Sequence, residues 1–183
     1  MLAYLFWHWP EQPTGVAAYE HGLAAFHRQL NETGSEGFHG STPYRIDGAG
    51  WLPEGRGYED WYLLDGSFAL DPLNEVAVSP GLRPAHDGTA HAAGGGAGGL
   101  YRLIEDHQAP AAAPSATWFS KPRGMRYPDF YQRAAEFTES VGFSFWRRQM
   151  VMGPAPEFCL LGAGLPDLPA EWLPVRIVRS AVG

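Results

Sequence analysis

The residues of this chain best suited to chemistry are its histidines, and all seven lie before residue 108. An imidazole takes up or releases a proton near neutral pH and is also a common metal ligand. His8 ends one aromatic segment, and Asp60 lies in another between Tyr58 and Tyr62. A carboxylate beside an imidazole orients the ring and favours its protonated form. If the two segments are neighbours, His8, Asp60 and Tyr62 form a candidate catalytic acid–base site.

Alternation along these two segments, read as strands, predicts which side chains share a face. One face of the first strand is purely apolar and is expected to lie under helices: Ala3, Leu5, Trp7 and Trp9. The other face has polar tips and suits a barrel interior or a ligand cavity: Leu2, Tyr4, Phe6 and His8. Tyr58, Asp60 and Tyr62 belong with this second face. We therefore expect Tyr4, Phe6 and Tyr58 to bind a ligand. The alternative reading of His8 and Asp60 is a partly buried structural pair.

Other polar residues give weaker candidates. His39 and Arg45 share a face of a strand predicted over 38–46, and Arg45 could bind an anionic ligand group. An exposed edge-strand arginine is the alternative reading. His86, Asp87 and His91 offer metal-ligand types, but their spacing matches no established motif, so a solvated loop is favoured. We expect no metal site and no cofactor.

An apolar stripe of 3.6-residue period predicts a helix after the first strand: Val16, Tyr19, Leu23, Phe26 and Leu30. His21 and His27 flank this stripe and are interpreted as surface residues. A second helix is predicted from the matching stripe that contains Phe130 and Phe137.

These stripes belong to an internal duplication. Phe6-Trp7-His8-Trp9-Pro10 is echoed by Trp118-Phe119-Ser120-Lys121-Pro122, which aligns His8 with Ser120. The predicted units are a first repeat over 1–107, with a glycine-rich loop at 80–99, a linker over 108–114, and a second repeat over 115–183. Glycine-rich segments hold no unique backbone alone, so we expect a mobile loop there.

Each repeat reads β-α-β-β-(α)-β, which is the ferredoxin-like order. The predicted fold class is α+β, with two ferredoxin-like βαββ(α)β repeats forming a fused dimeric-type α+β barrel. In this order the first and third strands are antiparallel neighbours, which brings His8 near Tyr58 and Asp60. The chain thus resembles the dimeric α+β barrel superfamily over nearly its whole length, through element order and not through a specific motif. This resemblance implies a ligand between the sheet and its flanking elements.

The amino-acid composition narrows the classes of binding partner that we expect. The formal net charge of −7 and pI of about 5.4 argue against nucleic acid, which needs clustered basic residues. Cys159 is the only cysteine, which fits a reducing cytoplasm, and the apolar N-terminus is too short to cross a membrane. We expect no membrane partner, and a monomer or weak homodimer, because a fused duplication removes one need to dimerise.

The leading functional hypothesis is a protein that binds a small apolar or aromatic metabolite in an aromatic cavity. Its catalytic options are those of a cofactor-independent oxygenase, isomerase or lyase. One alternative is a non-catalytic structural or interaction protein whose aromatic residues all lie in the core. Another is haem binding through His8 or His39. A cavity favours the first reading, and a closed core favours the second.

Overall fold

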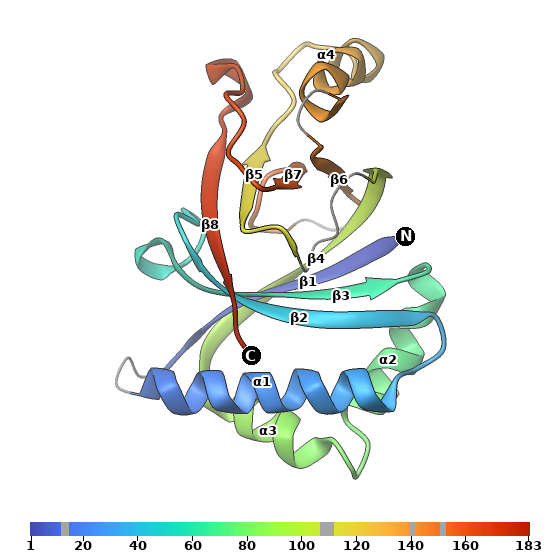
Figure 1. The fold of residues 1–183 in the computed structure, drawn as a ribbon, viewed down its shortest axis with the longest axis vertical. Helices are drawn as coiled ribbons and strands as arrows, with labels where there is room; N and C mark the ends of the chain where they lie inside the picture. The colour runs from blue at the N-terminus through green and yellow to red at the C-terminus, as the bar shows by residue number, and fades with distance from the viewer. Residues whose placement is uncertain (12–14, 107–111, 140–141, 151–152) are drawn as a thin grey trace.

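The computed structural model describes residues 1–11, 15–106, 112–139, 142–150 and 153–183. In these residues the strands form a closed antiparallel barrel in the order β1-β3-β2-β8-β5-β7-β6-β4 (Figure 1). The first half of the chain supplies β1 (Leu2–Pro10), α1 (Val16–Thr33), β2 (Phe38–Asp47), β3 (Arg56–Leu64), α2 (Leu70–Ala77), α3 (Arg83–Ala92) and β4 (Ala93–Glu105). The second half supplies β5 (Ser115–Phe119), α4 (Tyr127–Glu139), β6 (Ser144–Arg148), β7 (Phe158–Gly162), the short 3-10 turn η5 (Ala170–Trp172) and β8 (Val175–Ala181).

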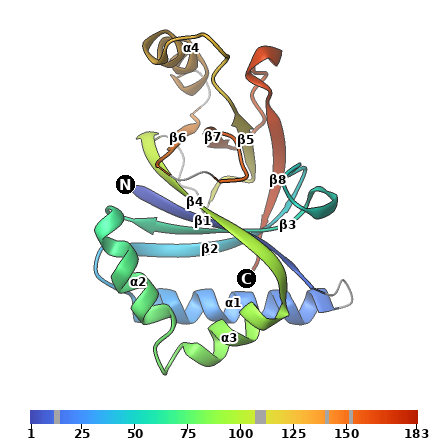
Figure 2. The same cartoon turned by 180° about the vertical axis from the view of Figure 1, so that it is seen from behind.

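The helices cover the two ends of an elongated molecule. Helices α1, α2 and α3 lie together on the outside of the β1–β4 half, whereas α4 lies at the opposite end beyond β5, β6 and β7 (Figures 1 and 2). The barrel wall therefore has two covered outer faces and one interior. Helix α1 presents Tyr19, Leu23, Phe26 and Leu30 to the wall, as the apolar stripe predicts. No helix in the described part of the chain is long and apolar enough to cross a bilayer.

The barrel interior is packed with tryptophan side chains. The rings of Trp7 and Trp118 meet edge to face at 5.6 Å, and those of Trp61 and Trp146 at 5.2 Å. Glu59, fully buried among them, accepts hydrogen bonds from the indole nitrogens of Trp7 at 2.8 Å and Trp61 at 2.6 Å. Arg179 lies with its Nε 3.3 Å from the same carboxylate and compensates its charge. This interior is a filled core.

The prediction of two ferredoxin-like βαββ(α)β repeats forming a fused dimeric-type α+β barrel is wrong. The strands form one closed eight-stranded antiparallel barrel, with four α-helices in the described residues. Closure comes from the pairing of β2 with β8 and of β4 with β6, which leaves no open edge among the described strands. A sequence pattern marks strands and helices but does not state which strand edges join. One local prediction is confirmed: β1 and β3 are antiparallel neighbours, with Phe6 opposite Asp60 and His8 opposite Tyr58.

The prediction that the apolar face of the first strand lies under the helices is also wrong. Ala3, Leu5 and Trp7 belong to the core inside the barrel. Leu2, Tyr4 and Phe6 instead pack against Phe26 and its neighbours under the helices. A narrow barrel interior reached by every strand excludes water more completely than a face covered by a few helices. The purely apolar face of β1 therefore points into the interior, and its face with polar side-chain ends lies under the helices.

The prediction of a glycine-rich loop over 80–99 is wrong as well, because this segment forms α3 and the start of β4. Strand β4 pairs with β1 along its length, with Gly96 opposite His8 and Gly98 opposite Phe6. The missing side chains make room for aromatic rings of β1: a Cβ at Gly98 would lie 3.0 Å from the Tyr4 ring. Glycine here serves close packing and not mobility. The predicted linker over 108–114 lies partly outside the described residues.

Candidate functional site

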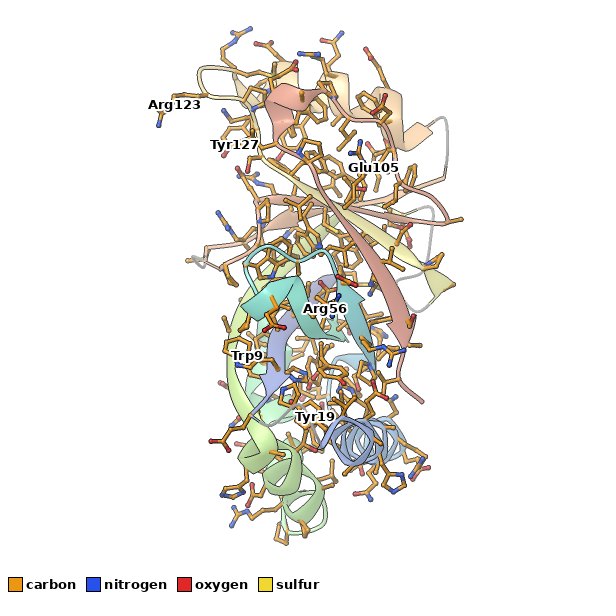
Figure 3. All side chains as sticks on the ribbon, turned by 90° about the vertical axis from the view of Figure 1, so that its left-hand side faces the viewer. Trp9, Tyr19, Arg56, Glu105, Arg123 and Tyr127 are labelled. Atoms are coloured by element: carbon orange, nitrogen blue, oxygen red, sulfur yellow. The ribbon has the colours of Figure 1, made fainter. Side chains whose placement is uncertain are left out.

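A cavity of about 430 Å³ lies between the outer face of the barrel and the three helices of the first half. Its size falls within the usual range of small-molecule sites, roughly 300–1,000 Å³. The walls come from β1 and β3 on one side and α1, α2 and α3 on the other, with these lining residues: Tyr4, Phe6, His8, Tyr19, Leu23, Phe26, Asp60, Tyr62, Leu70, Asp71, Leu73, Asn74, Ala77, His86, Thr89, Ala90 and Ala93. In Figure 3, Tyr19 lies where α1 faces the strands. The cavity is mostly apolar, with a polar group on the barrel wall.

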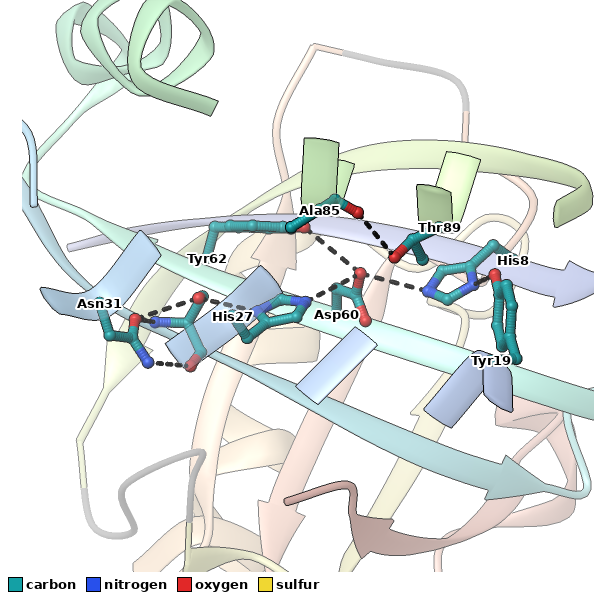
Figure 4. A network of polar contacts seen from close by, with 9 residues as sticks. His8, Tyr19, His27, Asn31, Asp60, Tyr62, Ala85 and Thr89 are labelled. Atoms are coloured by element: carbon teal, nitrogen blue, oxygen red, sulfur yellow. Dashed lines mark hydrogen bonds and ion pairs between the residues drawn. The ribbon is translucent and has the colours of Figure 1, made fainter. Parts of the chain in front are cut away.

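This polar group is centred on the carboxylate of Asp60, which is 2% exposed. Its Oδ2 lies 3.2 Å from Nε2 of His8 and 3.2 Å from Nε2 of His27. The Tyr62 hydroxyl donates a hydrogen bond to the same oxygen at 3.3 Å. On its far side, Nδ1 of His8 lies 2.5 Å from the Tyr19 hydroxyl. Figure 4 shows the resulting line of contacts from His27 through Asp60 to His8 and Tyr19.

The electrostatics of the site favour a charged carboxylate and neutral phenols. Burial raises the pKa of Asp60, but the charges of His8 and His27 more than offset it and hold this pKa well below its usual range. Burial, followed by the negative charge of Asp60, raises the pKa of Tyr62 and of Tyr19 well above the usual range. Both phenols therefore keep their protons and can donate hydrogen bonds.

Several polar atoms of the site are incompletely satisfied. Among the described residues, Nε2 of His8, Nε2 of His27 and Oδ1 of Asp60 are buried and make no aligned hydrogen bond. The two imidazole contacts with Asp60 have the distance of ion pairs without the alignment of hydrogen bonds. Buried groups are normally satisfied in native proteins, and catalytic contacts often become aligned only when a ligand binds. This pattern is typical of a site that awaits a ligand.

Similarity to a known structure exists at the level of the fold. A solved structure, "Crystal structure study of anthrone oxidase-like protein", matches with a TM-score of 0.56 at 10% sequence identity. The match covers 100% of this chain and 91% of that one. At this identity the likeness shows a shared fold only. No protein-family model matches the chain, and no curated protein matches its sequence.

The structure brings most of the predicted site residues together. His8, Asp60, Tyr62, Tyr4 and Phe6 all line the cavity. The aromatic cavity is thus present, although it lies under the helices and not inside the barrel.

The remaining predicted residues lie around the cavity or apart from it. Tyr58 stacks on His8 with ring centroids 5.4 Å apart, and its hydroxyl donates to Glu20 at 3.0 Å. His39 and Arg45 lie outside the cavity, where His39 pairs with the exposed Asp65 at 2.5 Å and Arg45 with Glu20 at 3.3 Å.

Sequence reasoning missed His27 and Tyr19 as site residues, and the surface interpretation of His27 is wrong. His27 is only 2% exposed and contacts Asp60 directly. The signal was present in the helix pattern, because Tyr19, Leu23 and His27 are spaced by four residues and so lie on one helical face. His21, in contrast, is exposed as predicted.

The described residues contain no group of three or more His, Cys, Asp or Glu side chains arranged to hold a metal ion. His86 lies on α3 and not in a loop, and its Nδ1 pairs with Asp87 Oδ1 at 2.9 Å. The two ring nitrogens of His8 lie beside Tyr19 and Asp60. His39, the other haem candidate, is outside the cavity.

The second half of the molecule has no comparable polar group among its described residues. Trp7 and Trp118 both face the interior, so the next residues, His8 on β1 and Phe119 on β5, both face outward under helices. Phe119 packs with Phe130, Phe145, Phe158 and Trp172 in a solid aromatic cluster. Counted from the interior tryptophan of each strand, the counterpart of His8 is therefore Phe119 and not Ser120, which lies beyond the end of β5. The space between the barrel and its helices thus holds a polar cavity in the first half and a solid aromatic cluster in the second.

Proposed function

We propose that this protein binds a small aromatic metabolite in the cavity and removes a proton from it without a cofactor. The observation that carries the proposal is the buried Asp60 carboxylate, in contact with two imidazoles and a phenol on the wall of an aromatic cavity. Burying a charge is costly unless it is compensated, and such arrangements occur preferentially at functional sites. The rival reading, with all aromatic residues in a closed core, does not account for the cavity.

His8 is the proposed general base, and it acts through Tyr19. Tyr19 lines the cavity and its hydroxyl lies 2.5 Å from Nδ1 of His8. A ligand proton moves to the Tyr19 oxygen while the Tyr19 proton moves to Nδ1, so the phenol never carries a full negative charge. Asp60 stabilises the imidazolium that forms, as the carboxylate does in a Ser-His-Asp triad. Tyr62, a neutral donor, can stabilise negative charge that develops on the ligand.

The reaction best supported is oxidation of an activated aromatic ketone or phenol. The name of the structural neighbour, an anthrone oxidase-like protein, supports anthrone as a probe. Loss of a proton from the methylene carbon of anthrone gives an electron-rich anion that can transfer electrons to O2 directly. Conversion to anthraquinone consumes one O2 and releases one water, so the atoms and electrons balance without a cofactor. Isomerase and lyase reactions share the first proton transfer and differ in their later steps.

The test is anthrone binding and oxygen consumption by the purified protein. We expect anthrone to quench the protein fluorescence in a saturable way and the protein to accelerate oxygen uptake. His8→Gln should lower the turnover by at least about 100-fold, which is typical for loss of a general base. The matched control is His21→Gln, because His21 is an exposed histidine of α1 that lies outside the cavity. Absence of anthrone binding, or equal turnover in His8→Gln, contradicts the proposal.

A further inference from the structure

A line of polar contacts continues from Asp60 on the side away from the cavity. His27 does not line the cavity, yet its Nε2 lies 3.2 Å from Asp60 Oδ2 and its Nδ1 lies 2.8 Å from the Ser41 hydroxyl. His27 is 2% exposed and Ser41 is 6% exposed, so this is a buried connection. Acid–base chemistry at His8 does not itself require a second imidazole on the same carboxylate.

The line ends at Asn31, which holds Ser41 in place. The Asn31 amide donates to the Ser41 carbonyl oxygen at 2.9 Å and accepts from the Ser41 backbone N–H at 2.7 Å. The Ser41 hydroxyl also lies 3.1 Å from Asn31 Oδ1. Asn31 and Ser41 both line a surface groove of about 400 Å³ that shares no lining residue with the cavity. The buried contacts therefore connect the cavity with a separate, open part of the surface.

We propose that His27 and Ser41 form a proton-transfer route between the acid–base site and this groove, with Asn31 as a positioning residue. The proposal rests on the proposed function, because the route carries the proton that His8 takes from the ligand to solvent and carries one proton back when O2 is reduced to water. The conversion to anthraquinone releases no net proton, so the route works once in each direction during a turnover. A bound ligand fills the cavity and blocks the direct way out, so a path behind Asp60 removes this obstacle.

The geometry places each donor close to its acceptor, and the two imidazole contacts with Asp60 need only to become aligned for transfer. Both imidazoles contact the same oxygen of Asp60, so a proton can pass from His8 Nε2 to Oδ2 and on to His27 Nε2 without rotation of the carboxylate. The His27 imidazolium then gives its Nδ1 proton to the Ser41 oxygen, while the Ser41 proton passes to water in the groove. Between transfers, Asn31 Oδ1 accepts the Ser41 proton in a hydrogen bond and leaves the hydroxyl oxygen open to Nδ1. One proton enters at Tyr19 and one leaves at Ser41, so every group returns to its original charge, but each imidazole then carries its proton on the other ring nitrogen. The return transfer restores both original tautomers.

A purely structural role of these residues would be to hold α1 against β2. Two hydrogen bonds between the Asn31 side chain and the Ser41 backbone do this, and neither needs the Ser41 hydroxyl. Ser41→Ala therefore removes the route and keeps both of these bonds. Ser41→Thr restores a hydroxyl, and Thr42→Val removes a hydroxyl from the neighbouring residue that lines the same groove.

The experiment measures how fast the ring N–H proton of His27, which does not line the cavity, exchanges with solvent, by NMR of the full chain labelled with 15N-histidine. We expect Ser41→Ala to slow the exchange by at least about tenfold, a modest fraction of a general acid–base effect. Ser41→Thr should restore the exchange, and Thr42→Val should leave it unchanged. If Ser41→Ala does not fold, Ser41→Gly removes the same hydroxyl and gives the same test at His27.

The outcomes separate this route from the proposed function. Unchanged exchange in Ser41→Ala overturns the route, even if anthrone is oxidised normally. Slow exchange in Ser41→Ala that Thr does not restore also overturns it, because the effect is then structural. Slow exchange restored by Thr supports the route, and this holds even if anthrone fails to bind, a result that overturns only the anthrone function.

Discussion

Asp60 is a buried charged residue on the wall of the cavity. Its carboxylate is buried, and two imidazoles and a phenol converge on one of its oxygens. Replacement by asparagine keeps the shape and removes the charge that holds the imidazoles. We expect Asp60→Asn to lower the free energy of unfolding by about 3 kcal/mol at pH 7, since loss of one partner from a buried pair costs roughly 3–5 kcal/mol. Asp65→Asn, at the exposed partner of His39, should cost less than about 1 kcal/mol. Denaturant unfolding of both variants measures this difference.

The same residue predicts how stability depends on pH. The pKa of Asp60 is lower in the folded protein than in the unfolded chain, so the contribution of its charge is fully present above the unfolded value of about 4. It is lost as the pH falls from there through the folded value. The stability difference between wild type and Asp60→Asn should therefore shrink as the pH falls below about 4. A difference that grows in acid would show that the carboxylate is not stabilised by its charge.

Single residues also show how far the sequence led to the site. His8, Asp60 and Tyr62 could be grouped because alternation on two strands is a strict geometric rule and the two strands are neighbours. His27 could not be recognised by its type, because a histidine beside an apolar stripe is usually exposed. Its partner lies 33 residues away in sequence at Asp60, and only the packing of α1 on β3 brings them together. To predict which residues of a helix are buried, one must know which side of the helix the other elements cover.

At the scale of elements, β4 is the strand that closes the first half of the wall. Its glycines lie against aromatic side chains of β1, so even one methyl group has no room. A Cβ at Gly96 would meet the Phe6 ring and lie 2.9 Å from the Trp7 carbonyl oxygen. We expect Gly96→Ala to destabilise the protein by about 1–3 kcal/mol, as overpacking does. The matched control is Gly88→Ala on the exposed side of α3, which has no neighbour within 4 Å and should be neutral or stabilising by up to about 1 kcal/mol. Thermal unfolding distinguishes the two.

The same strand shows why elements were harder to predict than residues. The strands containing His8 and Asp60 and the helix stripe of α1 were found because their periodicity is strong. The segment over 80–99 lacks periodicity, and its glycines are favourable only next to large rings that the local sequence does not reveal. Membership of the dimeric α+β barrel superfamily stays a prediction, because a likeness at 10% identity to one named protein does not bear on it.

The whole molecule is a closed barrel with unlike ends. One outer face carries a cavity with charged and polar groups, and the other carries a solid cluster built on Phe119, Phe158 and Trp172. Closure without free edges and a filled tryptophan core make the wall a rigid support for both ends. A rigid wall holds His8 and Asp60 at fixed separation, which a proton-transfer site requires. The helices that complete the cavity are more accessible: α3 has no buried residue.

The reactivity of the Cys159 thiol reports how often the closed barrel opens. Its side chain faces the barrel interior with no solvent exposure, and burial, with Glu59 nearby, raises the pKa of its thiol well above the usual range. A thiol reagent can react only when β7 separates from β5 and β6, so the reaction rate counts openings of the barrel. We expect native protein to react at least about 1,000 times more slowly than denatured protein, in line with opening that is close to global. Gly96→Ala should speed the reaction and Gly88→Ala should not. Rapid modification of the native protein would mean that β7 separates locally from β5 and β6 while the rest of the barrel stays closed.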